Sequence, residues 1–284
     1  MRRYPITTLL LSLALAGCRH TVPLGGGKSL LCISRTSQKK FLANLGHPNY
    51  CGAVVSRSRI GDRLFVQFED PTSSYSVAIV SSNGLALKSL PGEGCLDEEG
   101  APVFWTGWSN RMRIPFRLRG GAILPTNVYP NGPSDGRFVS MFRAHQDHWW
   151  IASVESPLEE ILTLDWEKEF EFLISKGNRL HVFVRGKPEG KPRPDRWFIL
   201  KRYEYEINDN KARLLEIQDF YFTWTVLDFD PESRLMYAAS WNVPFAHGII
   251  VDTATGRRKN VRGRGGRGYI VSESVARRFE EALK

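Results

Sequence analysis

The feature that most constrains the fold of this 284-residue chain is a recurring turn followed by arginine and an apolar run. The copies begin at Gly61, Asp135, Gly177 and Glu232. Their separations are 74, 42 and 55 residues, and the first of these fits two units with a degenerate one between them. The fullest copy, Asp230–Val261, contains two apolar runs, the tight turn Thr253–Gly256 and a third short run. Alternation of apolar and polar residues between such turns predicts short antiparallel strands in repeated units.

These units resemble the blades of the β-propeller superfamily. The likeness rests on the strand, turn, strand layout, on the D-x-x-T-G turn that ends at Gly256, and on a period near 40–45 residues. It is broadly similar to WD-repeat and quinoprotein-like blades, although the Gly-His and Trp-Asp pairs of true WD repeats are missing. The resemblance implies an all-β domain over residues 29–284, a β-propeller of five or six degenerate blades. A β-sandwich is the alternative, because its hairpins alternate in the same way.

The repeat also predicts where units begin and how the chain ends. Ser29–Val55 is expected to form a unit of its own, and Gly61–Leu90 a second unit of three strands. The tail Ser272–Lys284 is the best helix candidate, with Ser272 or Ser274 as the cap. Its apolar stripe, formed by Val275, Phe279 and either Ala282 or Leu283, is expected to pack against the last blade or across the rim of the propeller.

The N-terminus reads as an export leader that ends at a cysteine. Arg2 and Arg3 form a positive region, and Ile6–Ala16 is apolar but too short to span about 30 Å of hydrocarbon as a helix. The sequence Leu15-Ala16-Gly17-Cys18 resembles the lipobox of bacterial lipoproteins. That resemblance implies a signal peptide over residues 1–17, cleavage before Cys18, and acylation of Cys18 with palmitate as a membrane anchor. An ordinary secretory signal is the alternative.

Two features after the leader bear on location. Arg19 stands where an Asp commonly retains Gram-negative lipoproteins at the inner membrane, so the resemblance implies the outer membrane. Residues 18–28, which include three glycines, are expected to form a flexible, lipidated tether. The predicted location is therefore the cell envelope, with the protein lipid-anchored to the membrane.

The chain is basic, with a formal net charge of +9 and a cluster of arginines near its C-terminal end. The candidate residues for binding an anionic surface are Arg257, Arg258, Lys259, Arg262, Arg264 and Arg267. Export argues against a nucleic-acid partner and favours anionic lipid, an anionic envelope polymer or an envelope protein. A solvated loop that joins the last blade to a terminal strand is the simpler interpretation of the same run.

Three cysteines follow Cys18. Cys32 and Cys51 are the disulfide candidates, which would leave Cys95 as a buried thiol. The pairs Cys32–Cys95 and Cys51–Cys95 remain open. No metal-binding spacing is present in the sequence, and no metal or cofactor is expected.

No stretch of the sequence has the pattern of a catalytic site. His145-Gln146-Asp147-His148 resembles part of a metallo-hydrolase signature but lacks its first histidine, and its position favours a polar turn between strands. The acidic groups at Glu69-Asp70, Asp97-Glu98-Glu99 and Glu159-Glu160 all fall in predicted turns, which favours solvated surface. Seven tryptophans could stack on sugars but are expected in the core between blades: Trp105, Trp108, Trp149, Trp150, Trp197, Trp224 and Trp241.

These observations favour a lipid-anchored envelope binding or scaffold protein without catalytic activity. Two alternatives stay open. One is a glycan-active enzyme on the same propeller scaffold, which would need two facing carboxylates about 5–10 Å apart. The other is a smaller β-sandwich lipoprotein with a structural role.

Overall fold

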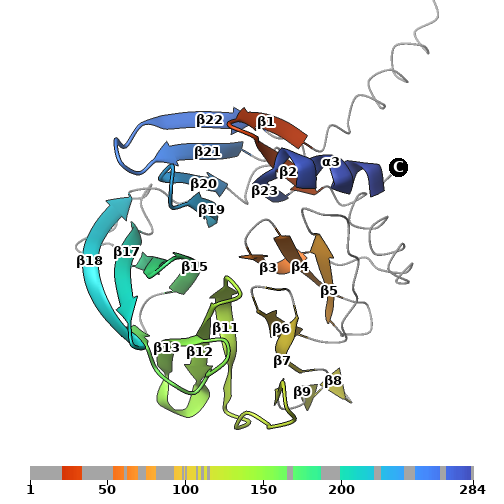
Figure 1. Ribbon diagram of the computed structural model, residues 1–284, viewed down its shortest axis with the longest axis vertical. Helices are drawn as coiled ribbons and strands as arrows, with labels where there is room; N and C mark the ends of the chain where they lie inside the picture. Colours follow the sequence, from red (N-terminus) through yellow and green to blue (C-terminus); the bar gives the residue numbers. More distant parts are fainter. Residues whose placement is uncertain are drawn as a thin grey trace, which may run out of the picture.

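In the computed structural model, the described residues form six antiparallel sheets of three or four strands that stand in a ring (Figure 1). The structure describes residues 21–33, 54–60, 63–69, 75–80, 93–97, 99, 101–106, 108–109, 112–113, 116–164, 169–186, 199–220, 225–239, 247–262 and 267–282. Because the sheets are arranged radially around an axis and do not form two packed layers, the protein is a β-propeller. This confirms the predicted fold class and sets aside the β-sandwich.

Five of these six blades follow one another along the chain. The first two have three described strands each: β3 (Val54–Ile60), β4 (Arg63–Glu69) and β5 (Tyr75–Val80), then β6 (Glu93–Leu96), β7 (Pro102–Thr106) and β10 (Arg117–Leu118). A short hairpin, β8 (Trp108–Ser109) with β9 (Met112–Arg113), lies between β7 and β10 in the chain.

The next three blades have four strands each. They are β11 (Val128–Ser134), β12 (Phe138–Arg143), β13 (His148–Ser153) and β14 (Leu162–Leu164); β15 (Glu169–Lys176), β16 (Arg179–Gly186), β17 (Ile199–Asn208) and β18 (Lys211–Phe220); and β19 (Thr225–Asp230), β20 (Leu235–Ala239), β21 (His247–Asp252) and β22 (Arg258–Arg262). Within each blade every strand pairs antiparallel with the next.

The sixth blade joins the two ends of the chain and is called here the closing blade. Strand β2 (Lys28–Ile33) pairs on one side with β1 (Thr21–Gly25) and on the other with β23 (Arg267–Ser272). Gly26 and Gly27 form the β1–β2 turn with φ of 62° and 73°, a left-handed pair that glycine adopts without steric cost.

The closing blade corrects two sequence predictions. The flexible tether was expected to reach residue 28, but Thr21–Gly25 is a paired strand, so the tether prediction is wrong from Thr21 onward. Ser29–Val55 does not form a unit of its own, because β2 pairs with the C-terminal strand β23. Hydrophobic alternation cannot distinguish these cases, since it reports that a strand is half buried and not which strand it pairs with.

The position of the turn-arginine motif within each blade also differs from the prediction, which placed it at the start of a unit. The turn-arginine motif lies between the first and second strands of a blade, as at Gly177, which follows β15 and precedes β16. Each blade therefore begins one strand before the motif. The Thr253–Gly256 turn lies between the third and fourth strands of its blade.

The core consists of apolar clusters between neighbouring blades. One cluster joins Cys95 and Val103 to Trp150 of β13, and a second joins Ile151 to Val182 and the other inward residues of β16 and β17. A third joins Phe183 to strands β19–β21. Trp150 is fully buried, as predicted, and its Nε1 donates to the Pro157 carbonyl at 3.0 Å. Burial of side chains of this size contributes about 1.5–3 kcal/mol each, so the contacts between blades are a main source of stability.

Helix α3 (Glu273–Ala282) follows β23 directly, as the tail pattern predicted. It contacts β2 and β23 of the closing blade. The Glu273 N–H donates to the Gly27 carbonyl at 2.9 Å, and Thr21 Oγ1 donates to Glu280 Oε1 at 2.6 Å. Ala276 is buried, while the side chains of Val275 and Phe279, expected in the apolar stripe, lie outside the described residues. No helix among the described residues is long and apolar enough to cross a bilayer.

Candidate functional site

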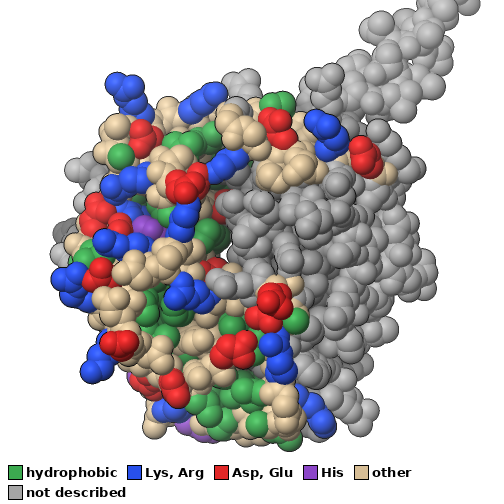
Figure 2. Space-filling view, viewed as in Figure 1, with side chains coloured by type: hydrophobic (Ala, Val, Ile, Leu, Met, Phe, Trp, Pro, Cys, Tyr) green, Lys and Arg blue, Asp and Glu red, His purple; other side chains and the backbone are tan. Residues whose placement is uncertain are grey.

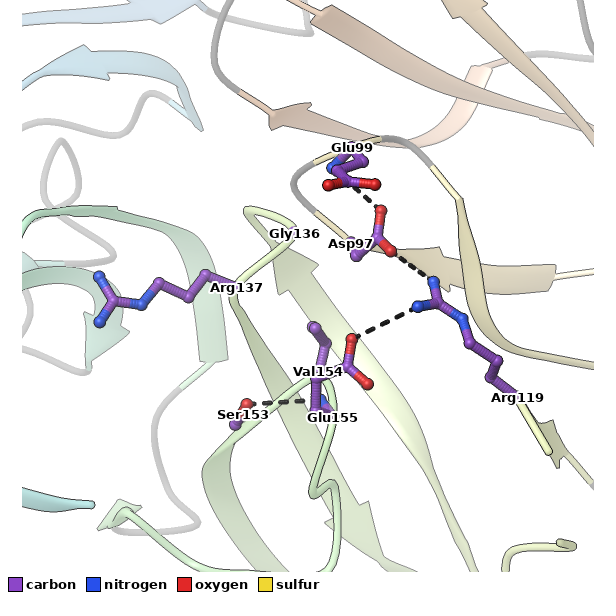
Figure 3. A pocket seen from close by; sticks show the side chains of 8 residues that line it. All are labelled: Asp97, Glu99, Arg119, Gly136, Arg137, Ser153, Val154 and Glu155. Atoms are coloured by element: carbon purple, nitrogen blue, oxygen red, sulfur yellow. Dashed lines mark hydrogen bonds and ion pairs between the residues drawn. The ribbon is translucent and has the colours of Figure 1, made fainter. Parts of the chain in front are cut away.

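A cavity of about 330 Å³ opens between the β6–β7–β10 blade and the β11–β14 blade (Figure 3). Eight residues from four chain segments line it: Asp97, Glu99, Arg119, Gly136, Arg137, Ser153, Val154 and Glu155. All of these segments are turns or strand ends, so the cavity belongs to one face of the ring. We call this the first-turn face, defined by the turns at Asp97, Gly136, Gly177 and Glu232, where the first strands of successive blades end.

Asp97, directly after β6, is the centre of a charged network in this cavity. Its Oδ1 accepts from the N–H groups of Glu99 and Ala101, at 3.0 and 2.8 Å. Its Oδ2 accepts a hydrogen bond from Arg119 Nη2, and Arg119 Nη1 lies 3.7 Å from Glu155 Oε1. One guanidinium thus bridges carboxylates from two blades (Figure 3).

The network keeps its central groups fully charged near neutral pH. Burial raises the pKa of Asp97, but hydrogen bonds from Arg119 and from the Ala101 N–H outweigh it, so the pKa lies below its ordinary value. The hydrogen bond to Asp97 raises the pKa of Arg119 further above neutrality. A general acid or base works best with a pKa near the working pH, so these shifts favour charge recognition over proton transfer.

Arg137 lines the same cavity and reaches the next blade. Its guanidinium donates to the Gly177 carbonyl in the turn between β15 and β16. The preceding Asp135 is buried and accepts hydrogen bonds from the Phe138 N–H at 2.8 Å and from the Ser175 N–H at 2.5 Å. The β11–β12 turn is therefore stabilised by a hydrogen bond within the turn and by two hydrogen bonds to the β15–β16 hairpin of the next blade. These contacts fix one wall of the cavity.

Charged side chains of both signs cover the described part of the surface. Figure 2 shows Lys and Arg side chains intermingled with Asp and Glu over the face in view, without a single-sign patch. Ion pairs account for part of this pattern, for example Arg213 with Glu206 and Lys176 with Glu232. Although the chain has a net charge of +9, its basic side chains do not form one broad basic patch on that face.

The predicted anionic-surface residues are divided between two places. Arg257, Arg258 and Lys259 are exposed, and they lie at the turn and start of edge strand β22. Arg262 ends β22 and Arg267 begins β23, whereas Arg264 lies outside the described residues. The interpretation of the whole run as a loop is wrong, because Arg258–Arg262 pairs with β21.

The structure describes only some of the cysteines and tryptophans considered in the sequence. Cys18 and Cys51 lie outside the described residues, and so does the side chain of Cys32 within β2. Cys95 is a buried thiol, as expected, with its Sγ 3.0 Å from Ser134 Oγ. The tryptophan side chains that the structure describes are those of Trp149 and Trp150.

The His145–His148 stretch forms a turn, as predicted. Helix η1 (Ala144–Gln146) and the left-handed Asp147 connect β12 to β13. His148 Nε2 lies 2.9 Å from Glu160 Oε2. Among the described residues, no three His, Cys, Asp or Glu side chains are grouped in a way that could hold a metal ion.

A second polar cluster, absent from the sequence predictions, lies between the β15–β18 and β19–β22 blades. Arg202 on β17 is fully buried and lies 3.1 Å from His181 Nδ1 and 3.1 Å from Glu204 Oε2. Its Nη2 donates to Glu216 Oε2 at 2.5 Å, and its guanidinium lies 5.7 Å from the centre of the Phe229 ring. The cluster has a buried centre at Arg202 and His181 and a half-exposed edge at Glu216. It ties the two blades together through Arg234, which also pairs with Glu216 at 3.0 Å.

Comparison with known proteins gives a distant likeness of fold. No protein-family model and no curated protein matches the chain. Among solved structures, TolB from Acinetobacter baumannii is similar at 12% identity with a TM-score of 0.46, over 78% of this chain and 57% of that one. A proposed 6-phosphogluconolactonase from Bacteroides fragilis is similar at 12% identity with a TM-score of 0.31, over 78% of this chain and 58% of that one.

The chain thus spans less than two thirds of either structure. The class of the protein, a β-propeller with six blades among the described residues, rests on its own sheets.

Proposed function

We propose that this protein is a lipid-anchored, non-catalytic binding or scaffold protein of the cell envelope, and that the cavity at Asp97 and Arg119 receives a charged segment of a partner protein. The leader ending at Cys18 supports export and acylation. The anchor would hold the protein at a membrane, where an envelope protein or an anionic envelope polymer is the available partner.

The observation that carries the binding role is the set of ionised groups in the cavity. Three carboxylates and two guanidiniums line it, so the carboxylates outnumber the guanidiniums by one. Arg119 is shared between Asp97 and Glu155, while Glu99 is exposed at the rim. A lysine or arginine of a partner would complete this network with Glu99 and Glu155 as acceptors.

The alternative of a glycan-active enzyme requires a carboxyl that is protonated near neutral pH, facing an ionised one. In this cavity the pKa of Asp97 is shifted in the opposite direction, because Arg119 and two main-chain N–H groups stabilise its anion. This observation favours binding over glycoside hydrolysis.

The anchoring part of the proposal is tested by acylation. The Cys18→Ala variant should lose radiolabelled palmitate and leave the membrane fraction, while a Cys95→Ala variant should keep both properties. Equal labelling of the parent and the Cys18→Ala variant would refute the lipoprotein assignment.

The cavity is tested with a paired variant. Partners are cross-linked in envelope preparations, identified by mass spectrometry, and their affinity for the purified protein is measured. The Glu99→Gln/Glu155→Gln variant should bind a basic partner at least about tenfold more weakly, since each charge-assisted hydrogen bond contributes about 1.5–3 kcal/mol. Glu159→Gln is the matched control, because Glu159 is exposed and follows the same strand without lining the cavity. Equal affinity of the paired variant and this control would exclude the cavity as the binding site.

A further inference from the structure

The two ends of strand β1 lie at opposite faces of the propeller. The Gly26–Gly27 turn belongs to the first-turn face, because Lys28 next to it forms an ion pair with Asp230 at the end of β19. Thr21 pairs with Leu31, at the other end of the hairpin. With about 3.3 Å of rise per residue, β1 carries the chain about 13 Å from one face toward the other. The chain therefore enters the fold from the face opposite the cavity.

The opposite face is defined by the turns between second and third strands, such as η1 at Ala144–Gln146. We call it the second-turn face. Cys18 precedes Thr21 by three residues, and three residues reach at most about 11 Å. An acyl anchor on Cys18 would therefore stand within about one strand length of the second-turn face.

Two arginines are placed at this same face by strand pairing. The turn before β22 is tied to the first-turn face, since the Thr253 N–H donates to the Arg234 carbonyl at 2.9 Å. Strand β22 runs away from that face and ends at Arg262, which pairs with His247 at the start of β21. Strand β23 begins at Arg267, which pairs with Ile33 at the end of β2.

We propose that the anchored protein stands with its second-turn face toward the bilayer and its cavity facing away from it. Strand register places Arg262 and Arg267 at this face, and anionic phospholipid headgroups are the partner that two basic residues beside an acyl anchor favour. This orientation rests on the proposed acylation of Cys18. It leaves the Asp97–Arg119 cavity open to partners in the aqueous compartment.

The orientation is tested with the full, acylated protein in vesicles of phosphatidylglycerol and phosphatidylcholine. A fluorophore is placed at Gln146→Cys on the second-turn face or at Glu99→Cys on the first-turn face, and the signal of the parent chain is subtracted. Both positions are exposed. Quenching by a nitroxide carried on the lipid headgroup should be at least about threefold stronger at position 146, since such quenching falls steeply with distance from the headgroup layer. Equal or reversed quenching would overturn the orientation.

The charge contribution is tested on the Cys18→Ala chain, where binding depends on the protein surface alone. Arg262→Gln/Arg267→Gln should lower affinity for phosphatidylglycerol vesicles by about thirtyfold at low salt, as expected for two basic residues near an anionic surface. Arg257→Gln/Arg258→Gln removes the same charge from the other end of the strand and should stay within about twofold of its parent. Arg262→Lys/Arg267→Lys should restore binding, which separates charge from folding. Equal losses in both glutamine pairs would overturn the assignment to one face.

Different results would refute the acylation of Cys18 and the proposed orientation. If the parent chain carries no palmitate, the anchor is refuted whatever the vesicles show. If the acylated chain binds vesicles but position 99 is quenched as strongly as position 146, acylation stands and the orientation is refuted.

Discussion

Arg202 shows how one residue can hold two blades together. It is fully buried and contacts His181, Glu204 and Glu216, which come from three strands of the same blade. Its guanidinium lies beside Phe229 of the next blade. A buried guanidinium is tolerated only when most of its donors are satisfied, and this one has acceptors on several sides.

Replacing Arg202 should therefore destabilise the protein strongly. Arg202→Met removes the shared partner of the Glu204 and Glu216 carboxylates, each of which keeps a second arginine, Arg179 or Arg234. We expect a loss of about 1.5–3 kcal/mol in the free energy of unfolding, measured with urea. Arg213→Met is the matched control, because Arg213 pairs with Glu206 at the surface and should give a midpoint close to the parent. Similar midpoints for both variants would show that the buried cluster is not a structural anchor.

His181 in the same cluster predicts a pH dependence of stability. Burial lowers its pKa from 6.5 to about 4, with a smaller opposing effect from Glu204. Below pH 6.5 the unfolded chain binds a proton that the folded chain does not, so the free energy of unfolding should fall as pH decreases from about 6.5 toward 4. His181→Asn keeps a hydrogen-bond acceptor for Arg202 and should flatten the urea midpoint over this range. An unchanged slope in this variant would assign the pH dependence to other groups.

The sequence pattern predicts the burial of Trp150 but not the contacts of Arg202, His181 and Arg119. Trp150 was assigned to the core because large aromatic residues in alternating strands are usually buried. Arg202 and His181 were not identified, since an arginine on an alternating strand looks solvent-facing until the neighbouring blade is placed beside it. Arg119 was missed for a similar reason, because its partners Asp97 and Glu155 come from segments far apart in sequence.

At the scale of elements, two turns of the β19–β22 blade are joined to each other. Thr253 is buried, and both its N–H and its Oγ1 donate to the Arg234 carbonyl at 2.9 Å. The turn between the third and fourth strands is thereby fixed to the turn between the first and second. The adjacent Asp252 accepts from Thr255 Oγ1 at 2.6 Å, and this hydrogen bond lowers its pKa below the ordinary value.

Two Thr→Val substitutions distinguish the link between the two turns, made by Thr253, from the local turn contact between Thr255 and Asp252. Thr253→Val removes a buried hydroxyl donor and should cost about 1–3 kcal/mol in the free energy of unfolding. Thr255→Val makes the same chemical change at an exposed position two residues away and should have a smaller effect. Thermal unfolding followed by circular dichroism measures both. A larger loss for Thr255→Val would mean that the local turn matters more than the link to Arg234.

Strand positions were predictable and strand partners were not. Runs such as Arg179–Gly186, rich in apolar residues that favour strands, predict a strand, and the structure has one there. The start of each blade was displaced by one strand, because a turn signal marks a change of direction without saying which hairpin of the blade it belongs to. The pairing of Lys28–Ile33 with Arg267–Ser272 joins residues more than two hundred positions apart, which a local pattern does not encode.

At the scale of the whole molecule, the ring is closed by a blade built from both termini. Strand β23 supplies the contact of this blade with β19, while β1 and β2 come from the N-terminal end. Lys28 pairs with Asp230 of the preceding blade, and although burial raises the pKa of Asp230, this pairing and Ser233 lower it to about 2. Closure thus combines main-chain pairing, packing against α3 and a charged contact between blades.

Ring closure predicts that the last sixteen described residues are required for cooperative folding. A chain ending at Arg262 lacks β23 and α3, so β2, which carries the buried Leu30 and Leu31, loses its paired strand on one side. We expect a broad urea transition and rapid proteolysis, because an open ring leaves blade faces and strand edges exposed. A chain ending at Ala282 keeps α3 complete and should unfold like the parent. If the shorter chain unfolded with the parent's midpoint and slope, the other five blades would be stable without closure, and the closing blade would serve to position the N-terminus.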